Sequence, residues 1–468
     1  MQTFDLIIIG SGPGGYRAAV LAALRGLSVA VIEKAQWGGC CLNRGCVPKK
    51  TWHHTAKLIE ATQTLAGRGL EGKMTASLAG VWRHQREVVQ TVRASYTDYL
   101  KRLGVTAIAG SARFVDARTI TVDGGKMLHG RHVIIATGSS PFVPPQLPRT
   151  PGRILTTDDL FDEMPPAGRR VALIGSGVAS TELGYILSML GMEVVWLARQ
   201  HPLAGSRFSQ PAQKALREAL ARRGVTLRTD SRVQGVQVRA DGVLLTLPDG
   251  AQEKVDWVLL GAGRVPHTGG LAPDAAGVAC DVDGFVLVNE YQQTSVSHIY
   301  AIGDVANRAM TSNHALAEAT VAVANIIAPH SCHSRADSVP EAVYSALEMA
   351  RLGWNEDEAE EQGREPALGF ASFEANPAVL GEGGAPGFVR LVADHDSGEL
   401  LGAEMAGAGA GEHMHLLAAC YGEADALARL SRLAYNHPTR SEEIQNAAET
   451  LAAKWGLLEQ VFGKPGNV

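Results

Sequence analysis

The sequence lacks the features that mark several large classes of protein. It has no long run of basic or acidic residues and a net charge of only −5, so we expect no surface for nucleic acid or anionic membranes. No apolar run reaches the length of a membrane span. The opening residues, MQTFDLIIIG, show no basic region followed by a long apolar segment and a cleavage site. These absences favour a cytoplasmic protein.

Cysteine is also scarce, with six residues in a chain of 468. Cytoplasmic thiols stay mostly reduced, so these six do not predict a disulfide framework. Three of them crowd into the stretch GGCCLNRGCVPKK, residues 38–50, whereas Cys280, Cys332 and Cys420 are scattered and have no CxxC partner. A structural zinc site needs four ligands, so we predict no metal site.

The chain is longer than a single hydrophobic core usually supports, which predicts roughly two to four domains. The order strand, glycine turn, helix, strand occurs twice, over residues 4–33 and again over 169–199. This order is typical of dinucleotide-binding βαβ units. We therefore predict an α/β fold with two Rossmann-like domains, followed by an α+β domain near the C-terminus.

The first glycine turn, GSGPGG, follows the strand directly. Gly10, Gly12 and Gly15 match GxGxxG, with Gly14 as a further glycine in the turn. Such glycines allow the tight turn, the approach of a pyrophosphate and close helix packing. Glu33 ends the second strand, where an acid can accept hydrogen bonds from ribose hydroxyls. The alternative is a glycine-rich turn without a ligand.

The second glycine turn departs from this pattern. Gly175 and Gly177 fit, but Ser180 stands where a small Gly or Ala is usual. At the end of the following strand Ala198 occupies the position of the ribose-binding acid, and Arg199 comes next. Because arginine favours a ribose 2′-phosphate, this pattern favours NADP over NAD. The alternative is that Arg199 is a surface residue and the pocket takes NAD.

The crowded thiols can now be interpreted. Cys41 and Cys46 are five positions apart at the expected start of a helix, and Lys49 and Lys50 follow. A helix N-terminus and nearby lysines stabilise a thiolate and lower the pKa of a thiol. We predict a redox-active pair.

A candidate acid or base lies far away in the sequence, in NHPTRSEEIQ, residues 436–445. Glu442 is near enough to orient one imidazole nitrogen of His437, which leaves the other for proton transfer to or from a thiol. The alternative is a structural His–Pro turn at the start of a helix.

These segments together resemble the flavin-dependent pyridine nucleotide–disulfide oxidoreductases, the family of dihydrolipoamide dehydrogenase, glutathione reductase and mercuric reductase. The similarity runs along nearly the whole chain. In chain order, the segments are GSGPGGY, GGCCLNRGCVPKK, ATGSSPFVP, the second glycine turn, GAGRVP, TSVSHIYAIGDVAN, AVYSALEMARLG and HPTRSEE.

The resemblance implies FAD in the first unit, a nicotinamide cofactor in the second and a homodimer formed by the final domain. The implied domains are 1–149 and 274–335 for FAD, 150–273 for NAD(P) and 336–468 for dimerisation. In this arrangement, His437, held by Glu442, serves Cys41 of the partner subunit, and the active site is shared between subunits.

The resemblance also assigns roles by position. Cys41 is similar to the thiol that exchanges with substrate, and Cys46 to the thiol packed against the flavin. Glu182 is similar to the acid that pairs with either Lys49 or Lys50. The implied cofactor-binding residues are Gly10, Gly12, Gly14, Gly15, Glu33, Lys34, Gly39, Cys40, Ala112, Thr137, Gly138, Ser139, Asp304, Gly175, Gly177, Ser180, Arg199, Gly263 and Arg264.

The substrate is open between members of the family. No cysteine follows Cys420, which disfavours the mercuric and thioredoxin types, and the arginines that glutathione reductases carry on the first helix are replaced by Val20 and Leu21. GPGGY and CLNRGC are closer to the lipoamide type, while GCVPKK and Arg199 resemble the glutathione side. We expect a small dithiol or a lipoyl carrier protein as substrate. The alternatives are an NADPH-dependent glutathione-type reductase and a non-catalytic flavin-binding module.

Overall fold

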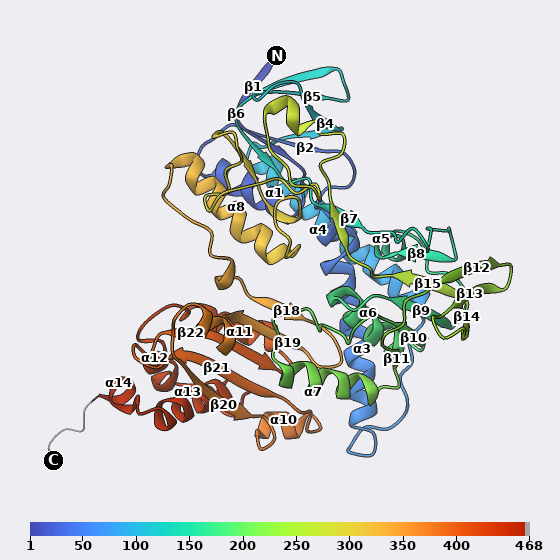
Figure 1. Cartoon of the computed structure of the whole chain (residues 1–468), viewed down its shortest axis with the longest axis vertical. Coiled ribbons are helices and arrows are strands. Elements are labelled where there is room, and N and C mark those ends of the chain that lie inside the picture. The colour runs from blue at the N-terminus through green and yellow to red at the C-terminus, as the bar shows by residue number, and fades with distance from the viewer. Residues whose placement is uncertain (464–468) are drawn as a thin grey trace. The chain divides into compact units, whose positions relative to one another are not determined.

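The computed structural model describes residues 1–463, and the last five residues of the expected C-terminal domain lie outside this range (Figure 1). The chain divides into two compact units. Unit 1 comprises 1–52, 77–175 and 233–336, and unit 2 comprises 53–76, 176–232 and the chain from 337 onward. No helix among the described residues is long and apolar enough to cross a membrane. The expected domain boundaries stay predictions.

Unit 1 is built on a seven-stranded sheet. Its strands are β1 (Gln2–Ile9), β2 (Val29–Glu33), β3 (Thr106–Ala109), β4 (Ala112–Phe114), β5 (Thr119–Val122), β6 (Lys126–Ile135) and β17 (Ile299–Ala301). The order is β3-β2-β1-β6-β5-β4, with β17 also paired to β6. The pairs among β1, β2, β3, β6 and β17 are parallel, and β4, β5 and β6 pair antiparallel. The first glycine turn and Glu33 follow neighbouring parallel strands, so they meet at one edge of the sheet.

Both faces of this sheet are buried, which explains why β1 is a continuous apolar run. Leu6 and Ile8 pack in one cluster with residues of α1 (Pro13–Leu24) and α8 (Ser312–Ile327), which Figure 1 draws beside the strands. Ile7 and Ile9 pack in a second cluster with apolar residues of β4, β5 and residues 271–286. The turn between β1 and α1 is therefore anchored by side chains on two faces.

Unit 1 contains further strands and helices. Parallel strands β8 (Ile154–Thr156), β15 (Trp257–Leu260) and β9 (Arg170–Ile174) pair in that order. The antiparallel groups are β12 (Gly235–Arg239), β13 (Gly242–Thr246) and β14 (Gln252–Val255), and β7 (Ser139–Pro141) with β16 (Arg264–Pro266). The helices are α2 (Gly39–Arg44), α4 (Leu78–Arg102), α5 (Thr157–Asp162) and the 3-10 turns η1 (Pro273–Ala276) and η2 (Gly303–Val305), while α3 (Cys46–Thr64) contains a boundary between the units.

Unit 2 combines two groups of elements. The first comprises α6 (Val178–Met189), β10 (Glu193–Leu197), α7 (Gln210–Ala221) and β11 (Thr226–Arg228), in which β10 and β11 pair in parallel. The second is an antiparallel sheet of β18 (Glu341–Val343), β19 (Met349–Gly353), β22 (Leu400–Ala406), β21 (Phe388–Asp394) and β20 (Pro366–Ser372). Its helices are α9 (Glu356–Glu361), α10 (Pro377–Gly381), α11 (Ala410–Ala418), α12 (Ala426–Arg432), α13 (Glu442–Lys454) and α14 (Leu458–Phe462), with η3 (Ala336–Ser338) before the sheet.

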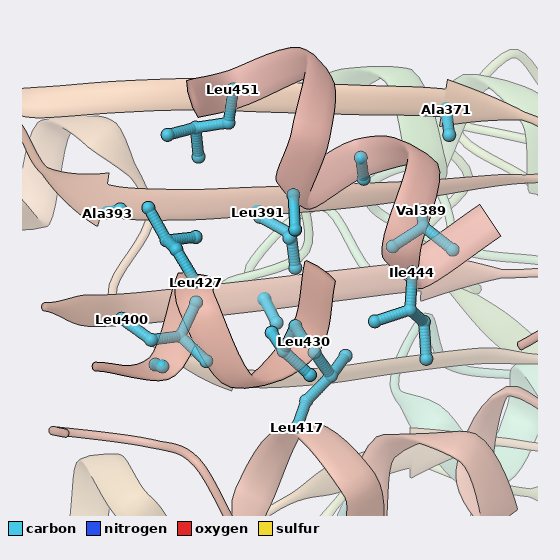
Figure 2. Packing of buried hydrophobic residues seen from close by; sticks show 14 of the residues in the cluster. Ala371, Val389, Leu391, Ala393, Leu400, Leu417, Leu427, Leu430, Ile444 and Leu451 are labelled. Carbon is cyan, nitrogen blue, oxygen red and sulfur yellow. The ribbon is translucent and has the colours of Figure 1, made fainter. Parts of the chain in front are cut away.

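The antiparallel sheet buries one face under helices. Figure 2 shows Ile444 and Leu451 of α13 pointing toward Val389 and Leu391 of β21. A Cβ at Gly369 of β20 would overlap the carbonyl oxygen of Ala447 in α13, so the helix lies directly on the strand. This packing fixes α13, which begins with the predicted acid Glu442.

The sequence predicted these elements unevenly. Apolar residues at helical spacing and few helix breakers in 74–104 predict one long helix. The structure confirms it as α4. The pattern of residues 282–307 also predicts several strands that end on Gly303 and Asp304. This prediction is wrong for most of the segment, because only β17 and isolated bridges form there. In this segment, hydrogen bonds from side chains take the place of the hydrogen bonds between paired strands. The Asn289 side chain accepts hydrogen bonds from the backbone N–H groups of Tyr291 and Gln293. Asn and Asp favour such turns over strands.

Candidate active site

The first glycine turn is packed at backbone contact. Gly10 has φ +107, and a Cβ there would overlap the carbonyl oxygen of Ala136. A Cβ at Gly15 would overlap the carbonyl of Gly10, and one at Gly14 would lie 3.1 Å from Ala315. No other residue type fits the turn at Gly10 or Gly15, because each position lacks room for a single carbon.

Gly12 lies in close backbone contact with Gly39 at the start of α1. Gly12 is the N-cap of α1 and provides no side-chain cap. A Cβ at Gly39, with φ +62, would lie 2.6 Å from the Gly12 Cα. The start of α1 therefore faces another bare backbone segment. This concave arrangement of backbone at a positive helix end fits the pyrophosphate of a dinucleotide.

Glu33 lies beside this backbone contact and is only 9 % exposed. Its carboxylate accepts hydrogen bonds from the Ser11 N–H at 2.9 Å, the Ser11 hydroxyl at 2.7 Å and the Ala35 N–H at 2.9 Å. Ser11 in turn accepts a hydrogen bond from the Gly38 N–H at 3.0 Å. The acid thus holds the turn in shape, and its role as a ribose acceptor stays a prediction. Lys34, the next residue, is exposed.

Four predicted cofactor residues from distant parts of the sequence form one polar group. Arg264 donates to the Ser139 hydroxyl at 2.7 Å and to the Ser139 carbonyl at 2.8 Å. The same hydroxyl donates to Asp304 at 2.5 Å. Arg264 also lies 3.4 Å from the Cys40 sulfur and 3.9 Å from both Asp304 and Asp158.

The Arg264 charge does not make Cys40 acidic. Burial raises the pKa of the Cys40 thiol to about 11, although the Arg264 guanidinium acts in the opposite direction. Burial also raises the pKa of Asp158, again opposed by Arg264. Cys40 is therefore a neutral thiol directed at Arg264, which is a different environment from that of Cys41.

Thr137 and Gly138 form the turn before Ser139. The Thr137 hydroxyl donates to the carbonyl of His267 at 2.6 Å, and the His267 N–H donates to the carbonyl of Gly138 at 2.9 Å. Burial lowers the pKa of His267, so its ring is neutral at pH 7. The Thr137 hydroxyl and the Gly138 carbonyl therefore both bind the turn to the backbone of His267, directly after β16. Ala112, another predicted contact, begins β4 and pairs with Val122.

The candidate redox pair lies across a break between two helices. Cys41 is in α2, Gly45 interrupts the helix with φ −132 and ψ −109, and Cys46 begins α3. A hydrogen bond to Cys46 raises the pKa of Cys41 well above its usual value, and burial adds to this effect. The Cys46 sulfur lies 3.1 Å from the Ser312 hydroxyl. The structure therefore brings the two predicted thiols together.

Sequence reasoning missed the residues that hold α2 in place. The Arg93 guanidinium on α4 donates to Asn43 at 2.5 and 3.0 Å, and the Asn43 amide donates to the carbonyls of Gly39 and Trp37. Arg44 lies 2.6 Å from Asp162 of α5. Both clamped residues stand between the redox cysteines, so the loop is fixed from two sides. Nothing in the local pattern indicates either partner, because α4 and α5 come much later in the sequence.

A pair of tyrosines also lies near the thiols. Tyr16 of α1 and Tyr96 of α4 stack with ring centroids 4.2 Å apart and an interplanar angle of 16°. Burial raises the pKa of Tyr96, and the charges of Cys41 and Cys46 add to this increase. These half-buried rings give the thiol pair an aromatic neighbour.

The second glycine turn has room for a side chain at its middle glycine. Gly175 has φ +124, while a Cβ at Gly177, the N-cap of α6, would meet nothing within 4 Å. Ser180 is fully buried in α6, and Ala198 is buried at the end of β10. Arg199 is exposed after that strand. The space and the exposed cation fit a nucleotide but do not fix its identity.

Two other predicted positions fall in separate places. Gly263 precedes β16 with φ +114 and open space around it. Glu182 is fully buried in α6 and accepts a hydrogen bond from the Tyr344 N–H at 2.8 Å. Lys49 and Lys50 lie in the part of α3 that belongs to unit 1, whereas Glu182 belongs to unit 2, so their pairing stays a prediction.

The predicted dyad near the C-terminus is formed. His437 Nδ1 lies 2.8 Å from Glu442, and the Thr439 N–H donates to the same carboxylate at 2.6 Å. The hydrogen bond from Thr439, followed by that from His437, lowers the pKa of Glu442. Because the carboxylate fixes Nδ1 as the protonated nitrogen, Nε2 is left to exchange a proton. The imidazole is largely exposed, with a side-chain exposure of 72 %.

Comparison with known proteins gives a consistent result over nearly the whole chain. Residues 4–320 match the family model "Pyridine nucleotide-disulphide oxidoreductase", and residues 339–448 match its dimerisation domain. The chain is 35 % identical to a dihydrolipoyl dehydrogenase of Thermus scotoductus, over 96 % of this chain and 98 % of that protein.

Solved structures show the same fold. The crystal structure of LpdA from Mycobacterium tuberculosis superimposes with a TM-score of 0.89 at 25 % identity, covering 96 % of this chain and 99 % of that one. The flavoprotein disulfide reductase RclA from Escherichia coli has a TM-score of 0.83 at 24 % identity, covering 95 % and 99 %. The predicted architecture, two dinucleotide-binding domains and a C-terminal antiparallel dimerisation sheet, is confirmed.

Proposed function

Because the chain belongs to the pyridine nucleotide–disulphide oxidoreductase family, we propose that it oxidises a lipoyl-type dithiol through the Cys41–Cys46 pair. At the coarser level it is an FAD-dependent disulfide oxidoreductase of the lipoamide dehydrogenase group. The observation that carries the proposal is the hydrogen-bonded thiol pair held between α2 and α3. The similarity to dihydrolipoyl dehydrogenases supports the substrate class.

The thiol chemistry follows from the positions of the two cysteines. In the oxidised protein the substrate thiolate attacks Cys41 of a Cys41–Cys46 disulfide, which forms a mixed disulfide and releases Cys46 as a thiolate. The second substrate thiolate then displaces Cys41, so the substrate leaves as a disulfide and both cysteines are reduced. In the proposed homodimer the partner subunit's His437 accepts the substrate proton at Nε2, and Glu442 stabilises the resulting imidazolium.

The residues of the first unit fit FAD. Gly12 and Gly39 provide the cradle for its pyrophosphate, Glu33 a ribose acceptor and Asp304 an acceptor for a polyol chain. When bound, FAD transfers the electron pair between a dithiol and a nicotinamide cofactor. Arg93 and Arg44 keep the redox loop in place during exchange.

We propose NADP as the preferred nicotinamide cofactor. Arg199 follows β10 as an exposed cation and the acid position is occupied by the buried Ala198, so a ribose 2′-phosphate meets no repulsion there. The proposed partner is a small dithiol or a lipoyl carrier protein, and the proposed location is the cytoplasm.

A glutathione-type reductase is the second candidate, and Arg199 with the GCVPKK segment favours it. The deciding experiment is anaerobic steady-state oxidation of dihydrolipoamide by the FAD-loaded protein, with NAD⁺ and NADP⁺ side by side. Oxidised glutathione with NADPH is the reverse assay. Turnover of glutathione without turnover of dihydrolipoamide would refute the lipoyl proposal.

A matched control separates both candidates from a non-catalytic flavin-binding module. Cys41→Ser removes the exchange thiol and is expected to abolish turnover with either substrate while FAD stays bound. Unchanged turnover in Cys41→Ser would mean that the thiol pair does not carry the reaction. Cys420→Ser, which changes a buried thiol in the C-terminal core, is the control for thiol loss elsewhere.

A further inference from the structure

The loop that follows β10 is attached to the second glycine turn. Residues 198–209 join β10 to α7, and the exposed Arg199 lies near the start of this loop. Leu203, near its middle, is buried and adopts a left-handed conformation with φ 60. Its N–H donates to the carbonyl of Ser176, within the glycine turn, at 2.9 Å. Because a leucine rarely adopts this φ, contacts elsewhere must hold the loop in place.

The first of these contacts is a two-point ion pair. The Arg207 guanidinium donates to the two carboxylate oxygens of Glu358 at 2.5 and 2.8 Å, and to the carbonyl of Gly353 at 3.1 Å. Glu358 lies in α9 and also accepts a hydrogen bond from the Asn355 N–H at 2.9 Å, so the acid is itself fixed. Paired bonds between guanidinium and carboxylate define an orientation as well as a contact. Arg207 is thereby fixed to the segment that follows β19.

The second contact is made by a buried carboxylate of the antiparallel sheet. Glu404 of β22 accepts hydrogen bonds from the Ser209 N–H at 2.8 Å and from the Ser209 hydroxyl. Within the sheet Glu404 stands opposite Arg351 of β19 and Arg390 of β21. Burial raises the pKa of Glu404, whereas the hydrogen bonds from Ser209 and the charges of the two arginines lower it. The donors of the loop thus offset part of the cost of burying this acid.

Buried polar contacts of this kind fix an orientation more than they add stability. Replacing a buried ion pair by apolar residues of similar size is often neutral or stabilising. Phe208, between the two attached residues, is buried and already supplies apolar contact. Arg207 is four positions from Leu203 and eight from Arg199. A change at Arg207 therefore reaches the glycine turn and the predicted phosphate contact through a short, constrained stretch of chain.

We propose that Arg207 is a positioning residue for the nicotinamide nucleotide, and that it acts by fixing the loop of residues 198–209 to the antiparallel sheet. With Arg207 bound to Glu358, the loop keeps Leu203 against Ser176 and Arg199 beside the end of β10. The inference deepens the proposed function, because it rests on nucleotide binding at the second glycine turn. Its role differs from that of Arg199, since the Arg207 guanidinium is engaged by Glu358 and acts through the loop.

The test compares nucleotide binding with stability in the oxidised holoenzyme. Calorimetric titrations with NAD⁺ and with NADP⁺ give the Kd of each nucleotide without any dithiol. Arg207→Met removes the guanidinium and keeps an apolar stem, while Glu358 retains the Asn355 N–H and its ion pair with Arg351 at 3.5 Å. We expect the Kd of the more tightly bound nucleotide to rise about tenfold, as for one lost contact to a charged group. The FAD content is expected to stay the same, and the unfolding temperature to change by less than about 4 °C.

Two further variants separate position from charge. Arg222→Met removes an exposed arginine at the end of α7 and is expected to leave both Kd values unchanged. Glu404→Gln weakens the second contact and is expected to raise the Kd in the same direction as Arg207→Met. Limited digestion with trypsin reports on the loop itself, since cleavage after Arg199 is expected to be faster in Arg207→Met than in Arg222→Met.

Unchanged Kd values in Arg207→Met would overturn the proposal and leave the ion pair with Glu358 as a purely structural contact. Equal weakening by Arg207→Met and Arg222→Met would also overturn it, because the effect would then come from charge alone. A wild-type protein that binds neither nucleotide would refute nucleotide binding by the second unit, and the proposal with it. No dithiol enters the measurement, so a failure of the lipoyl assignment leaves this result intact.

Discussion

The two glycine turns share a sequence pattern but differ in how tightly they are packed. A Cβ at Gly15 of the first turn would overlap the carbonyl oxygen of Gly10, whereas the equivalent position of the second turn, Ser180, carries a side chain. The middle glycines, Gly12 and Gly177, both leave room for a Cβ. The strand ends differ as well, with the hydrogen-bonded Glu33 in the first unit and Ala198 followed by Arg199 in the second. The third position of the motif is thus restricted to glycine by packing in the first turn but not in the second.

The largest effect is expected from adding one carbon to the first turn. Gly15→Ala forces the carbonyl of Gly10 to move and should destabilise the fold by about 3 kcal/mol or more. Gly177→Ala, at an ordinary φ of −78, should change the free energy of unfolding by less than about 1 kcal/mol. Urea unfolding of the two variants makes the comparison. Equal losses in both variants would contradict the backbone contact at Gly15.

The next effect concerns Glu33, which holds the first turn together. Glu33→Ala removes the acceptor for three hydrogen bonds from Ser11 and Ala35, so we expect a loss of about 2 to 3 kcal/mol in stability. FAD retention should weaken with it. The check is thermal unfolding with flavin fluorescence as a second signal, and Glu71→Ala, at an exposed position between α3 and α4, is the control. Unaltered flavin retention would contradict the role of this acid.

In the second unit Arg199 should influence the choice of nucleotide and little else. Arg199→Ala is expected to lower the preference for NADPH over NADH by about tenfold, about 1.4 kcal/mol, because one cation–phosphate contact is lost. The measurement is kcat/KM for both nucleotides. An unchanged preference for NADPH over NADH would mean that Arg199 is a surface residue without a role in nucleotide binding. The strand end after β10 would then have no function comparable with that of Glu33.

The effect that is smallest at neutral pH is a pH dependence in the first unit, because it develops only under alkaline conditions. Burial raises the folded pKa of Cys40 to about 11, so its contribution to stability is present below the unfolded pKa of about 8.5 and is lost as the pH rises toward 11. The loss should amount to roughly 1 to 3 kcal/mol. Cys40→Thr has no thiol to ionise and should show a flatter decline between about pH 8.5 and pH 11. The measurement is the free energy of unfolding of the wild-type protein and of Cys40→Thr across this pH range. The same pH dependence in both proteins would contradict the buried environment of the Cys40 thiol.

The elements that the sequence predicted are those with local signals. Apolar runs followed by glycines gave β1, β2 and the first turn, and the spacing of His437 and Glu442 gave a dyad that the structure forms. Both depend on residues close together in the chain. Local hydrogen bonds explain the error in 282–307, where Asn289 favours a turn over a strand.

The contacts that the sequence could not predict join distant segments. Arg264 reaches Ser139 and Cys40 across 125 and 224 positions, and Arg93 reaches Asn43 across 50. The family resemblance pointed to Arg264 and Ser139 as cofactor residues, but it did not indicate that they contact each other. Such pairs depend on how strands and helices are assembled, which no periodicity encodes.

The close seat of α13 on β20 has a consequence for how this protein tolerates change. The acid of the dyad is the first residue of α13, and the bare backbone at Gly369 is what lets that helix lie on the strand. A bulkier residue at position 369 would lift the helix and displace the imidazole, although it is 68 positions from His437 in the sequence and touches no reacting atom. Substitutions in the antiparallel sheet can therefore impair proton transfer by His437, although the sheet itself contributes no reacting group.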